Sequence, residues 1–374
     1  MLFGMSSHRW ATYIALRVVL RHVLGVKVER RRAEEARREL ARQRFVDSAH
    51  RICEEGAHVV IPVLSAPPAE LLRRLGAELV ESDFSQRLPR KDPIDEILDR
   101  VDIPEALKPL LPRKWELFGD VLVLKLDRAL DPHEKAVADA YAQVLRAKSV
   151  LRDVGGISGE LRQPGLRLLL GEDTVTTHVE NGVRFRFDVA QIMFSSGNME
   201  ERIRMSQIRC DGETVVDMFA GIGYFSLPLA VYQKPRRVIA CELNPVAYSY
   251  LSENIRLNRV AHIVEPVLGD NRSLDGESFA DRIIMGYVKT THEYLPAAMR
   301  MLRSGGMIHY HETCPGELLP HRPIQRLTRG LAGARVEINR VKEVKSFAPG
   351  VSHVVVDARV FKDERSPPCS RQAS

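Results

Sequence analysis

Apolar residues in the second half of the chain follow a regular alternation. Short apolar runs lie at 214–219, 237–243, 263–270, 281–287 and 305–312, and amphipathic stretches lie between them at 224–232, 247–258 and 295–302. Strands that alternate with helices in this way are typical of βαβ units. The pattern therefore predicts an α/β, Rossmann-like domain with a doubly wound, mostly parallel sheet over residues 191–361.

The first part of the chain has a different texture. Residues 27–45 are rich in Arg, Glu, Ala and Leu, which predicts a solvated helix. A strand is expected at 58–64 and a second helix at 68–83, and the polar, proline-containing segment 86–93 then marks a boundary. We interpret residues 1–92 as a variable, basic N-terminal domain.

Residues 93–190 mix helical and alternating patterns. Helices are expected at 94–101 and from Asp131 onward, with Asp131 as the cap and Pro132 at the first helical position. An apolar strand is expected at 120–126, and the β-branched, Gly- and Asn-punctuated segments after residue 153 indicate further strands. We interpret this part as a small α+β module. The polar tail 362–374 is expected to be disordered.

Composition and charge narrow the class of protein. The chain has 374 residues with 44% hydrophobic and 28% charged residues, which excludes a disordered or collagen-like protein. Of the net charge of +6, most lies in residues 1–60, where twelve Lys and Arg face seven Asp and Glu. This leading segment is the first candidate for contacts with nucleic acid phosphates, although a solvated helix face explains the charge equally well.

Cysteine usage and hydropathy indicate the compartment. The five cysteines are scattered and contain neither a C-x-x-C pair nor a zinc-like spacing, so we expect a reduced, cytoplasmic protein without a structural metal. The apolar stretch 10–26 is interrupted by Arg17 and Arg21 and has no small-residue cleavage site after it. Neither a signal peptide nor a membrane span is expected.

A glycine turn carries the strongest chemical signal. The strand at 214–219 contains Asp217 and is followed by Gly221 and Gly223, where missing β-carbons let a ligand lie against the backbone. Glu242 ends the next strand, where a carboxylate can accept both hydroxyls of a ribose. The third glycine of a dinucleotide fingerprint is replaced by Ser226.

A third element favours S-adenosylmethionine over a nicotinamide dinucleotide. Asp270 and Asn271 close the following strand, where Asp270 can hold the adenine amino group and Asn271 a neighbouring polar edge. In addition, Asp217 before the turn supplies a carboxylate suited to an ammonium group rather than to a pyrophosphate. Three such elements at the ends of successive strands predict an S-adenosylmethionine site.

Several of these motifs together resemble a known family. The segments that carry the likeness are 188–208 (DVAQIMFSSGNMEERIRMSQI), 215–230, 240–245, 251–258, 269–272 and 307–312. They look like the tRNA wybutosine-synthesising aminocarboxypropyltransferases, which are relatives of the tRNA guanine-37 N1-methyltransferases. The resemblance covers about residues 100–360 and implies a class I S-adenosylmethionine-dependent transferase fold. It implies cofactor contacts at Ser195, Arg202, Glu242, Asp270 and Asn271. The expected cofactor-binding set, completed by the turn, is Ser195, Arg202, Asp217, Phe219, Gly221, Gly223, Glu242, Asp270 and Asn271.

The segment after residue 285 decides which carbon of the sulfonium is attacked. In the amino-nitrogen and guanine-N1 methyltransferases it supplies an Asn or Asp followed by proline, whereas this chain has Gly286 and Tyr287 there. The smaller residue is expected to leave room for the methionine chain. The resemblance then implies transfer of the 3-amino-3-carboxypropyl group to carbon 7 of 4-demethylwyosine at position 37 of tRNA(Phe), with release of methylthioadenosine. The alternatives are a guanine-37 N1-methyltransferase and a non-catalytic tRNA-binding module.

The remaining candidates concern positioning and RNA. Arg202 is expected to hold the aminocarboxypropyl carboxylate, unless backbone N–H groups of the Ser195 loop do so. No general base is identifiable; His309 and His311, with Glu312, are candidates as bases or metal ligands, although such a pair on a buried strand is more typical of hydrogen-bonded core. The positioning candidates are Arg202, Gly286, Tyr287, His309 and His311, and the RNA-binding candidates are Arg30, Arg31, Arg32, Arg162 and Lys289. The expected partner is the anticodon stem-loop of tRNA(Phe), bound by a monomer.

Overall fold

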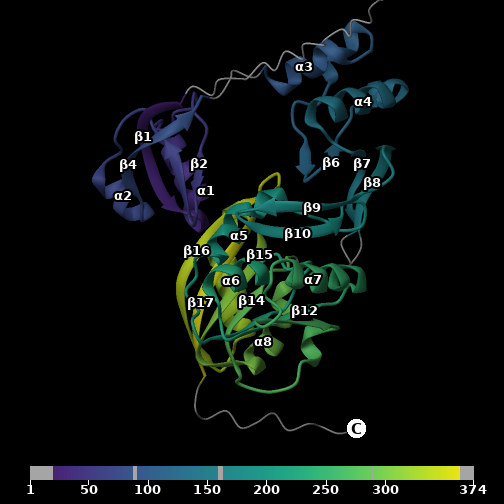
Figure 1. Cartoon of the computed structure of the whole chain (residues 1–374). Coiled ribbons are helices and arrows are strands. Elements are labelled where there is room, and N and C mark those ends of the chain that lie inside the picture. Colours follow the sequence, from purple (N-terminus) through teal and green to yellow (C-terminus); the bar gives the residue numbers. More distant parts are fainter. Residues whose placement is uncertain (1–19, 87–90, 159–162, 289, 363–374) are drawn as a thin grey trace, which may run out of the picture. The chain divides into compact units, whose positions relative to one another are not determined.

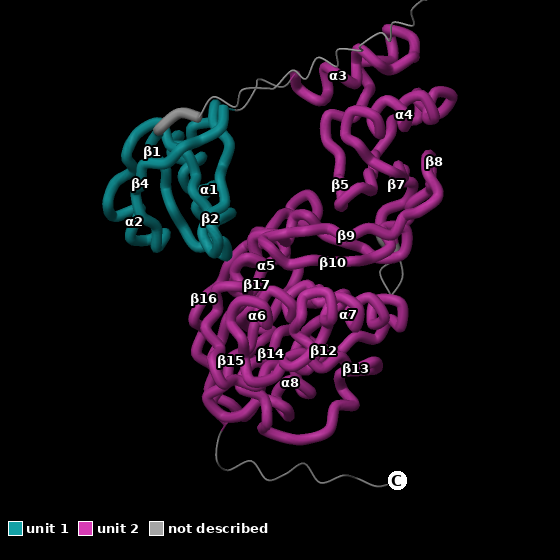
Figure 2. Tube along the Cα trace, in the orientation of Figure 1, with its two compact units in different colours: residues 1–90 teal, residues 91–374 magenta. Residues whose placement is uncertain are grey.

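The structure, a computed structural model, describes residues 20–86, 91–158, 163–288 and 290–362. The chain forms two compact units, residues 1–90 and residues 91–374 (Figure 2). Two RNA-binding candidates, Arg162 and Lys289, and the tail after residue 362 lie outside the described residues. No helix within the described ranges has the length and apolar character needed to cross a membrane.

The first unit is an antiparallel sheet with two helices. Its strands are β1 (Leu20–Glu29), β2 (Cys53–Glu55), β3 (His58–Pro62) and β4 (Glu78–Ser85), in the order β2-β3-β1-β4, and its helices are α1 (Ala33–Arg42) and α2 (Ala69–Leu75). Val26 and Val28 on β1 pack with Leu40 on α1 and Leu71 on α2 in one buried cluster. The small core thus forms between one face of the sheet and the apolar stripes of both helices.

The predicted limits of two helices in this unit are wrong. Lys27 pairs with Val60 in the sheet, so the segment expected as a helix from residue 27 begins as the end of β1 and becomes α-helical only at Ala33. The helix expected over 68–83 ends at Leu75, because Gly76 adopts a left-handed φ of 60° and β4 follows. In both cases pairing with a neighbouring strand overrides the local helical pattern.

The second unit begins with the small mixed module. It contains α3 (Pro93–Arg100), β5 (Glu116–Phe118), β6 (Val121–Leu124), α4 (Glu134–Leu145), β7 (Ser149–Ser158) and β8 (Gln163–Leu170), with the strands in the order β5-β6-β7-β8. The hairpin of β9 (Val175–Glu180) and β10 (Val183–Asp188) follows. The predicted start of the helix at Asp131 is wrong, because α4 begins at Glu134. Asp127 instead caps a 3-10 turn over Arg128–His133, and Pro132 lies inside that turn.

A seven-stranded sheet forms the rest of the unit (Figure 1). Its strands are β11 (Thr214–Asp217), β12 (Arg237–Glu242), β13 (Val264–Leu268), β14 (Ala280–Met285), β15 (Leu302–Pro315), β16 (Ala334–Ala348) and β17 (Val351–Lys362), and its helices are α5 (Met199–Met205), α6 (Ser226–Gln233), α7 (Pro245–Leu257), α8 (Leu295–Met301) and α9 (His321–Gly330). The strand order is β13-β12-β11-β14-β15-β17-β16, and β17 alone runs antiparallel to its neighbours β15 and β16. The expected doubly wound, mostly parallel sheet is confirmed.

Alternating side chains explain why helices cover both faces of this sheet. Val215 packs with residues of α6 and α7, whereas its neighbour Val216 packs with residues of α8 and α9. Val238 and Ile239 on β12 divide in the same way. Because both faces are covered, the carboxyl ends of the strands remain as the place for a ligand.

A buried ionic network joins α5 to the C-terminal strands. Asp357 on β17 accepts a hydrogen bond from Nδ1 of His309 at 2.6 Å and from Nη1 of Arg204 at 2.8 Å. The other ring nitrogen of His309 lies 2.7 Å from Nη1 of Arg282, and burial lowers the pKa of this histidine. His309 is therefore a neutral, doubly hydrogen-bonded core residue, and its candidacy as a base or positioning residue is wrong.

Glu312 is also a structural residue. Its carboxylate is buried and accepts hydrogen bonds from Arg322 and Arg326 of α9 and from the hydroxyl of Tyr310. No group of His, Cys, Asp and Glu side chains in the described part of the chain is arranged to hold a metal ion. The side chain thus ties α9 to β15.

We predict that Asp357→Asn destabilises the fold in a pH-dependent way. Burial opposes the charged form of Asp357, but the hydrogen bond from His309 and the charge of Arg204 outweigh it and lower its pKa to about 2. A lowered carboxyl pKa stabilises the folded state above about pH 4, by about 2 kcal/mol here, and this contribution disappears as the pH falls toward 2. Urea unfolding at several pH values measures it.

The difference between wild type and Asp357→Asn in free energy of unfolding should be largest near neutral pH and shrink in acid. Asp275→Asn is the matched control, because Asp275 is exposed and the variant should follow the wild type at every pH. A stability difference that stays constant from pH 6 to pH 2 would contradict the role assigned to the carboxylate.

Candidate functional site

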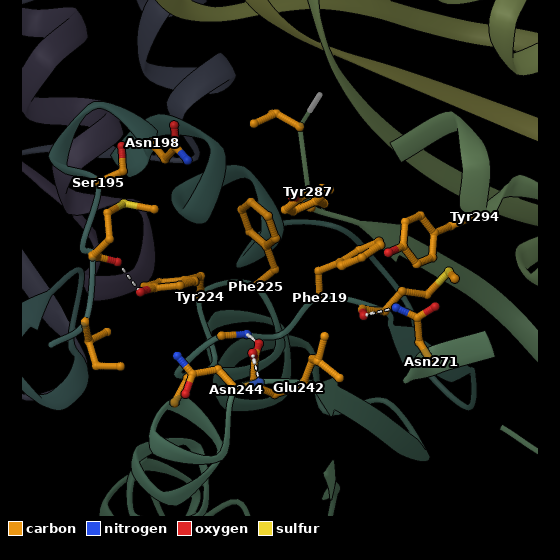
Figure 3. Close-up of a pocket in the computed structure, with 18 of the residues that line it drawn as sticks. Ser195, Asn198, Phe219, Tyr224, Phe225, Glu242, Asn244, Asn271, Tyr287 and Tyr294 are labelled. Atoms are coloured by element: carbon orange, nitrogen blue, oxygen red, sulfur yellow. Dashed lines mark hydrogen bonds between the residues drawn. The ribbon is translucent and has the colours of Figure 1, made fainter. Parts of the chain in front are cut away.

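A cavity lies at the carboxyl ends of β11, β12 and β14 (Figure 3). It is lined by nine residues expected from the sequence, namely Ser195, Arg202, Phe219, Gly221, Glu242, Asp270, Asn271, Gly286 and Tyr287. Asp217, Gly223, His309 and His311 are not among its lining residues. The parallel strands thus bring together residues that are up to 92 positions apart in the chain, between Ser195 and Tyr287.

Glu242 is fixed at the floor of the cavity by the backbone. One carboxylate oxygen accepts the N–H of Gly221 at 2.7 Å, and the other accepts the N–H of Asn244 at 2.8 Å. Burial raises the pKa of Glu242, and the backbone donors oppose this shift. Each oxygen keeps a second lone pair, so the carboxylate can accept both hydroxyls of a ribose without moving.

The two positions of the turn require glycine for different physical reasons. Gly221 lines the cavity and adopts a φ of 57°, which favours a residue without a β-carbon. Gly223 adopts a φ of 102°, and a β-carbon there would lie 2.5 Å from Cγ of Leu227. Gly221 therefore borders the cavity and leaves space for the ring of Tyr224, whereas Gly223 lets α6 pack against the turn.

Asp217 organises the turn from below. It is completely buried, its Oδ2 accepts the hydroxyl of Ser226 at 2.6 Å, and its Oδ1 accepts the N–H of Phe219 at 3.3 Å. Burial raises its pKa to about 6. The expectation that this carboxylate meets an ammonium group directly is wrong, because it lies behind the turn and outside the cavity wall.

The polar pair after β13 is arranged differently from the expectation. Asp270 is bound by the guanidinium of Arg272, whose charge and hydrogen bonds lower the pKa of the carboxyl. Asn271 donates to the carbonyl of Met218 at 2.7 Å, and its Oδ1 is buried without a hydrogen-bond partner. A buried acceptor without a donor is costly unless a ligand satisfies it. Asn271 is therefore the better acceptor for the adenine amino group.

Aromatic rings form one wall of the cavity. Tyr287 stacks on Phe219 with ring centroids 5.2 Å apart, and Tyr294 meets the edge of Phe219 at 4.9 Å (Figure 3). Arg272 lies over the ring of Tyr294. This wall offers flat apolar surfaces on which a purine can stack.

The opposite side of the cavity is polar. Arg202 gives Nε and Nη2 to the carboxylate of Glu180, each at 2.7 Å, and Nη1 to the carbonyl of Ser195 at 2.9 Å. The charge of Arg202 is thus balanced by Glu180, and its geometry supports shaping of the Ser195 loop. The hydroxyl of Ser195 accepts a hydrogen bond from Nζ of Lys345 at 2.6 Å. Lys345 supplies a cation that the sequence analysis did not identify.

Other lining residues were also missed. They include Asn198, Tyr224, Phe225, Asn244, Tyr294, Lys345, Phe347 and His353. The last three belong to the hairpin of β16 and β17, where apolar and polar residues alternate only from 334 to 338, a signal that predicts a strand. The side chain of Asn198 has a buried oxygen without a hydrogen-bond partner, so a donor on the ligand is expected there too.

We predict that Glu242→Gln weakens binding of S-adenosylmethionine about tenfold to a hundredfold, the loss expected when a charged acceptor of two hydroxyls becomes neutral. Isothermal titration calorimetry measures the dissociation constant. Glu265→Gln on the neighbouring strand is the control, because Glu265 is exposed and does not line the cavity. Equal affinities of Glu242→Gln and wild type would refute the ribose contact.

Comparison with known proteins gives this cavity a context. The family model described as the TRM5/TYW2 methyltransferase domain matches residues 176–339, a TYW2 N-terminal domain matches 94–174, and a tRNA methyltransferase 5 N-terminal domain matches 25–70. The tRNA(Phe) (4-demethylwyosine(37)-C(7)) aminocarboxypropyltransferase of Pyrococcus horikoshii is 48% identical over 275 residues, which cover 73% of this chain and 98% of the relative. The protein of the same name from Methanocaldococcus jannaschii is 44% identical over 248 residues, 66% of this chain and 97% of the relative.

A solved structure agrees with the sequence comparisons. The crystal structure of P. horikoshii TYW2 in complex with MeSAdo matches with a TM-score of 0.66 and 47% identity, over 72% of this chain and 98% of that chain. Both the catalytic sheet and the preceding module therefore have counterparts in enzymes of known structure. The chain belongs to the TRM5/TYW2 family of tRNA-modifying transferases and, within it, to the aminocarboxypropyltransferase branch.

Proposed function

We propose that the protein transfers the 3-amino-3-carboxypropyl group of S-adenosylmethionine to carbon 7 of 4-demethylwyosine at position 37 of tRNA(Phe) and releases methylthioadenosine. The relatives from P. horikoshii and M. jannaschii carry this activity in their names. The single observation on this chain that carries the proposal is the packing around Gly286.

Gly286 directly follows β14 and lies against an aromatic ring. A β-carbon built on this residue would lie 2.6 Å from Cε2 and 2.9 Å from Cδ2 of Phe225. The carboxamide that the methyltransferases place here has no space unless Phe225 moves. The ring of Phe225 occupies the space that a side chain on Gly286 would need, and room for the methionine chain stays a prediction.

The residues of the cavity act mainly by orientation. The sulfonium of S-adenosylmethionine activates three carbons, and the one that reacts is the one aligned with the nucleophile. Asn271 and the aromatic wall hold the adenine end, Glu242 holds the ribose, and the Ser195 loop with Lys345 receives the amino-acid end. A cofactor held at both ends has little freedom, so the wall at Gly286 and Phe225 selects the reacting carbon.

A second cavity adjoins the first and supports entry of an RNA base. The two share Ser195, Tyr287, Lys345 and Phe347 among their lining residues, and the second extends to Phe118 and Asp153 of the small module. Bases that leave the helical stack are held by aromatic surfaces and polar edges. The tricyclic base at position 37 fits such a site, with Tyr287 as one stacking surface.

Docking of the anticodon stem-loop is part of the proposal. Arg30, Arg31 and Arg32 lie directly after β1, where they form ion pairs with Glu54, Glu29 and Glu35, respectively. Exposed pairs of this kind are worth little, so phosphates can compete for the arginines. We propose a monomer that acts on tRNA in the cytoplasm.

We predict that label from the carboxypropyl chain of the cofactor, and not label from its methyl group, enters precursor tRNA. The measurement uses two separately labelled cofactors and mass spectrometry of the modified nucleoside. Methyl label in the RNA would favour the guanine-37 N1-methyltransferase, and no label from either cofactor would favour a binding module. The same reaction must release methylthioadenosine in equal amount.

We predict that Gly286→Asn lowers aminocarboxypropyl transfer at least about tenfold, because the side chain displaces Phe225 and misaligns the reacting carbon. The double variant Gly286→Asn with Phe225→Ala removes the clash and should recover part of the cofactor affinity. Ser273→Asn, in the exposed turn after Asn271, serves as the control. Full transfer activity of Gly286→Asn would contradict the assignment of this wall.

A further inference from the structure

Phe347 lines both cavities. It lies near the end of β16, and 42% of its surface is exposed. It is one of six residues that the two cavities share, the others being Ile192, Met193, Ser195, Tyr287 and Lys345. Residues common to two cavities lie where the cavities meet. Phe347 is therefore at the junction between the proposed cofactor site and the cavity proposed for the RNA base.

A β-bulge places Phe347 at this junction. The pairing register between β16 and β17 advances by two residues on β16, from Ser346 to Ala348, but by only one residue on β17. Phe347 is thus the extra residue, and a bulge of this kind redirects the side chain that it carries. Lys345, Ser346 and Phe347 all line the second cavity, although a regular strand would direct neighbouring side chains to opposite faces.

The other phenylalanine and tyrosine rings of the two cavities each contact another aromatic ring. Tyr287 stacks on Phe219 with 21° between the ring planes, and Phe225 stacks on His311 with centroids 5.3 Å apart. Within the part of the chain that the structure describes, Phe347 has no such neighbour. Its ring is therefore available for stacking on a flat ligand.

Exposure by itself does not identify a binding residue. Leu268 and Leu318 are 50% and 41% exposed, and neither lines one of these cavities. Single exposed apolar side chains of this kind are common on protein surfaces. Phe347 differs from them because a bulge directs it, two cavities meet at it, and no other ring covers it.

A base displaced from an RNA strand fits this junction. Single-stranded bases are held by stacking on aromatic side chains, and stacking does not depend on a particular hydrogen-bond pattern. Tyr287 and Phe347 both line the junction, and Tyr287 is itself supported by Phe219. A tricyclic base has one ring more than guanine, so it offers a larger surface to these side chains.

We propose that Phe347 is a specificity residue that stacks on the tricyclic base at position 37 and favours it over guanine. The inference rests on the proposed function. Tyr287 supplies a second aromatic surface at the same junction, and the third ring of 4-demethylwyosine adds contact area that guanine lacks. Loss of the Phe347 ring should therefore weaken binding of the tricyclic base more than binding of guanine.

The test replaces Phe347 by Ala and by Trp in the full chain. Binding is measured for two forms of tRNA(Phe), one with 4-demethylwyosine and one with guanine at position 37. Phe347→Ala should weaken binding of the tricyclic tRNA about tenfold to a hundredfold, the usual loss of a stacking ring, and binding of the guanine tRNA at least about threefold less. Phe347→Trp keeps an aromatic ring and should bind the tricyclic tRNA within about threefold of wild type.

Leu318→Ala is the matched control, because Leu318 is about equally exposed but lines neither cavity. This variant should bind both tRNAs as the wild type does. Phe347→Ala should bind S-adenosylmethionine within about threefold of wild type in the absence of tRNA, which also verifies that the variant is folded.

Three results would overturn the assignment of Phe347. They are unchanged binding of the tricyclic tRNA by Phe347→Ala, an equal loss for both tRNAs, and a tenfold or larger loss of cofactor affinity, which would place the ring on the cofactor instead. The binding comparison does not require turnover. Wild-type protein that binds the tricyclic tRNA but transfers no aminocarboxypropyl group would overturn the proposed function and not the stacking contact.

Discussion

The buried guanidinium of Arg204 holds the two halves of the site in register. It bridges Glu201 on its own helix and Asp357 on β17, with N–O distances of 2.5 and 2.8 Å. Removing one partner from such a buried set leaves an uncompensated charge, which costs about 3–5 kcal/mol. The helix that follows the Ser195 loop and the hairpin that carries Lys345 and His353 are therefore held together by this ion pair, and the hydrogen bond from Lys345 to Ser195 joins the same two parts.

That constraint explains why the cavity has two chemically distinct sides. The first strands and the glycine turn provide one side, which resembles the ligand site of dinucleotide-binding folds. There the Glu242 carboxylate is held by backbone N–H groups, and the amide oxygen of Asn271 is buried without a hydrogen-bond partner. The helix and the hairpin provide the other side, which contains Arg202, Lys345 and His353. The edge of the sheet thus supplies the groups that we propose for the nucleoside, and the hairpin supplies groups that we propose for the transferred chain.

Much of this arrangement follows from the sequence. Alternating strands and helices predict the doubly wound sheet, and the spacing of Gly221, Glu242 and Asn271 locates the cavity, because parallel strands end at one edge. The chemistry of single contacts does not follow. Asp217 and Asp270 have the right side chains, but Asp217 is buried under the turn and Asp270 is paired with Arg272, and the sequence reveals neither contact.

The residues that sequence analysis missed could not be predicted for one physical reason. Lys345 and His353 reach the cavity only because β17 inserts antiparallel between β15 and β16, and this choice of partners is a long-range event. The alternating pattern from 334 to 338 indicates a strand but not its neighbours. His309 and His311 illustrate the same limit, since adjacent positions on one face of β15 lead one ring into an ionic core and the other toward the cavity. Function in this fold is thus decided less by which residues a strand carries than by which strands it pairs with.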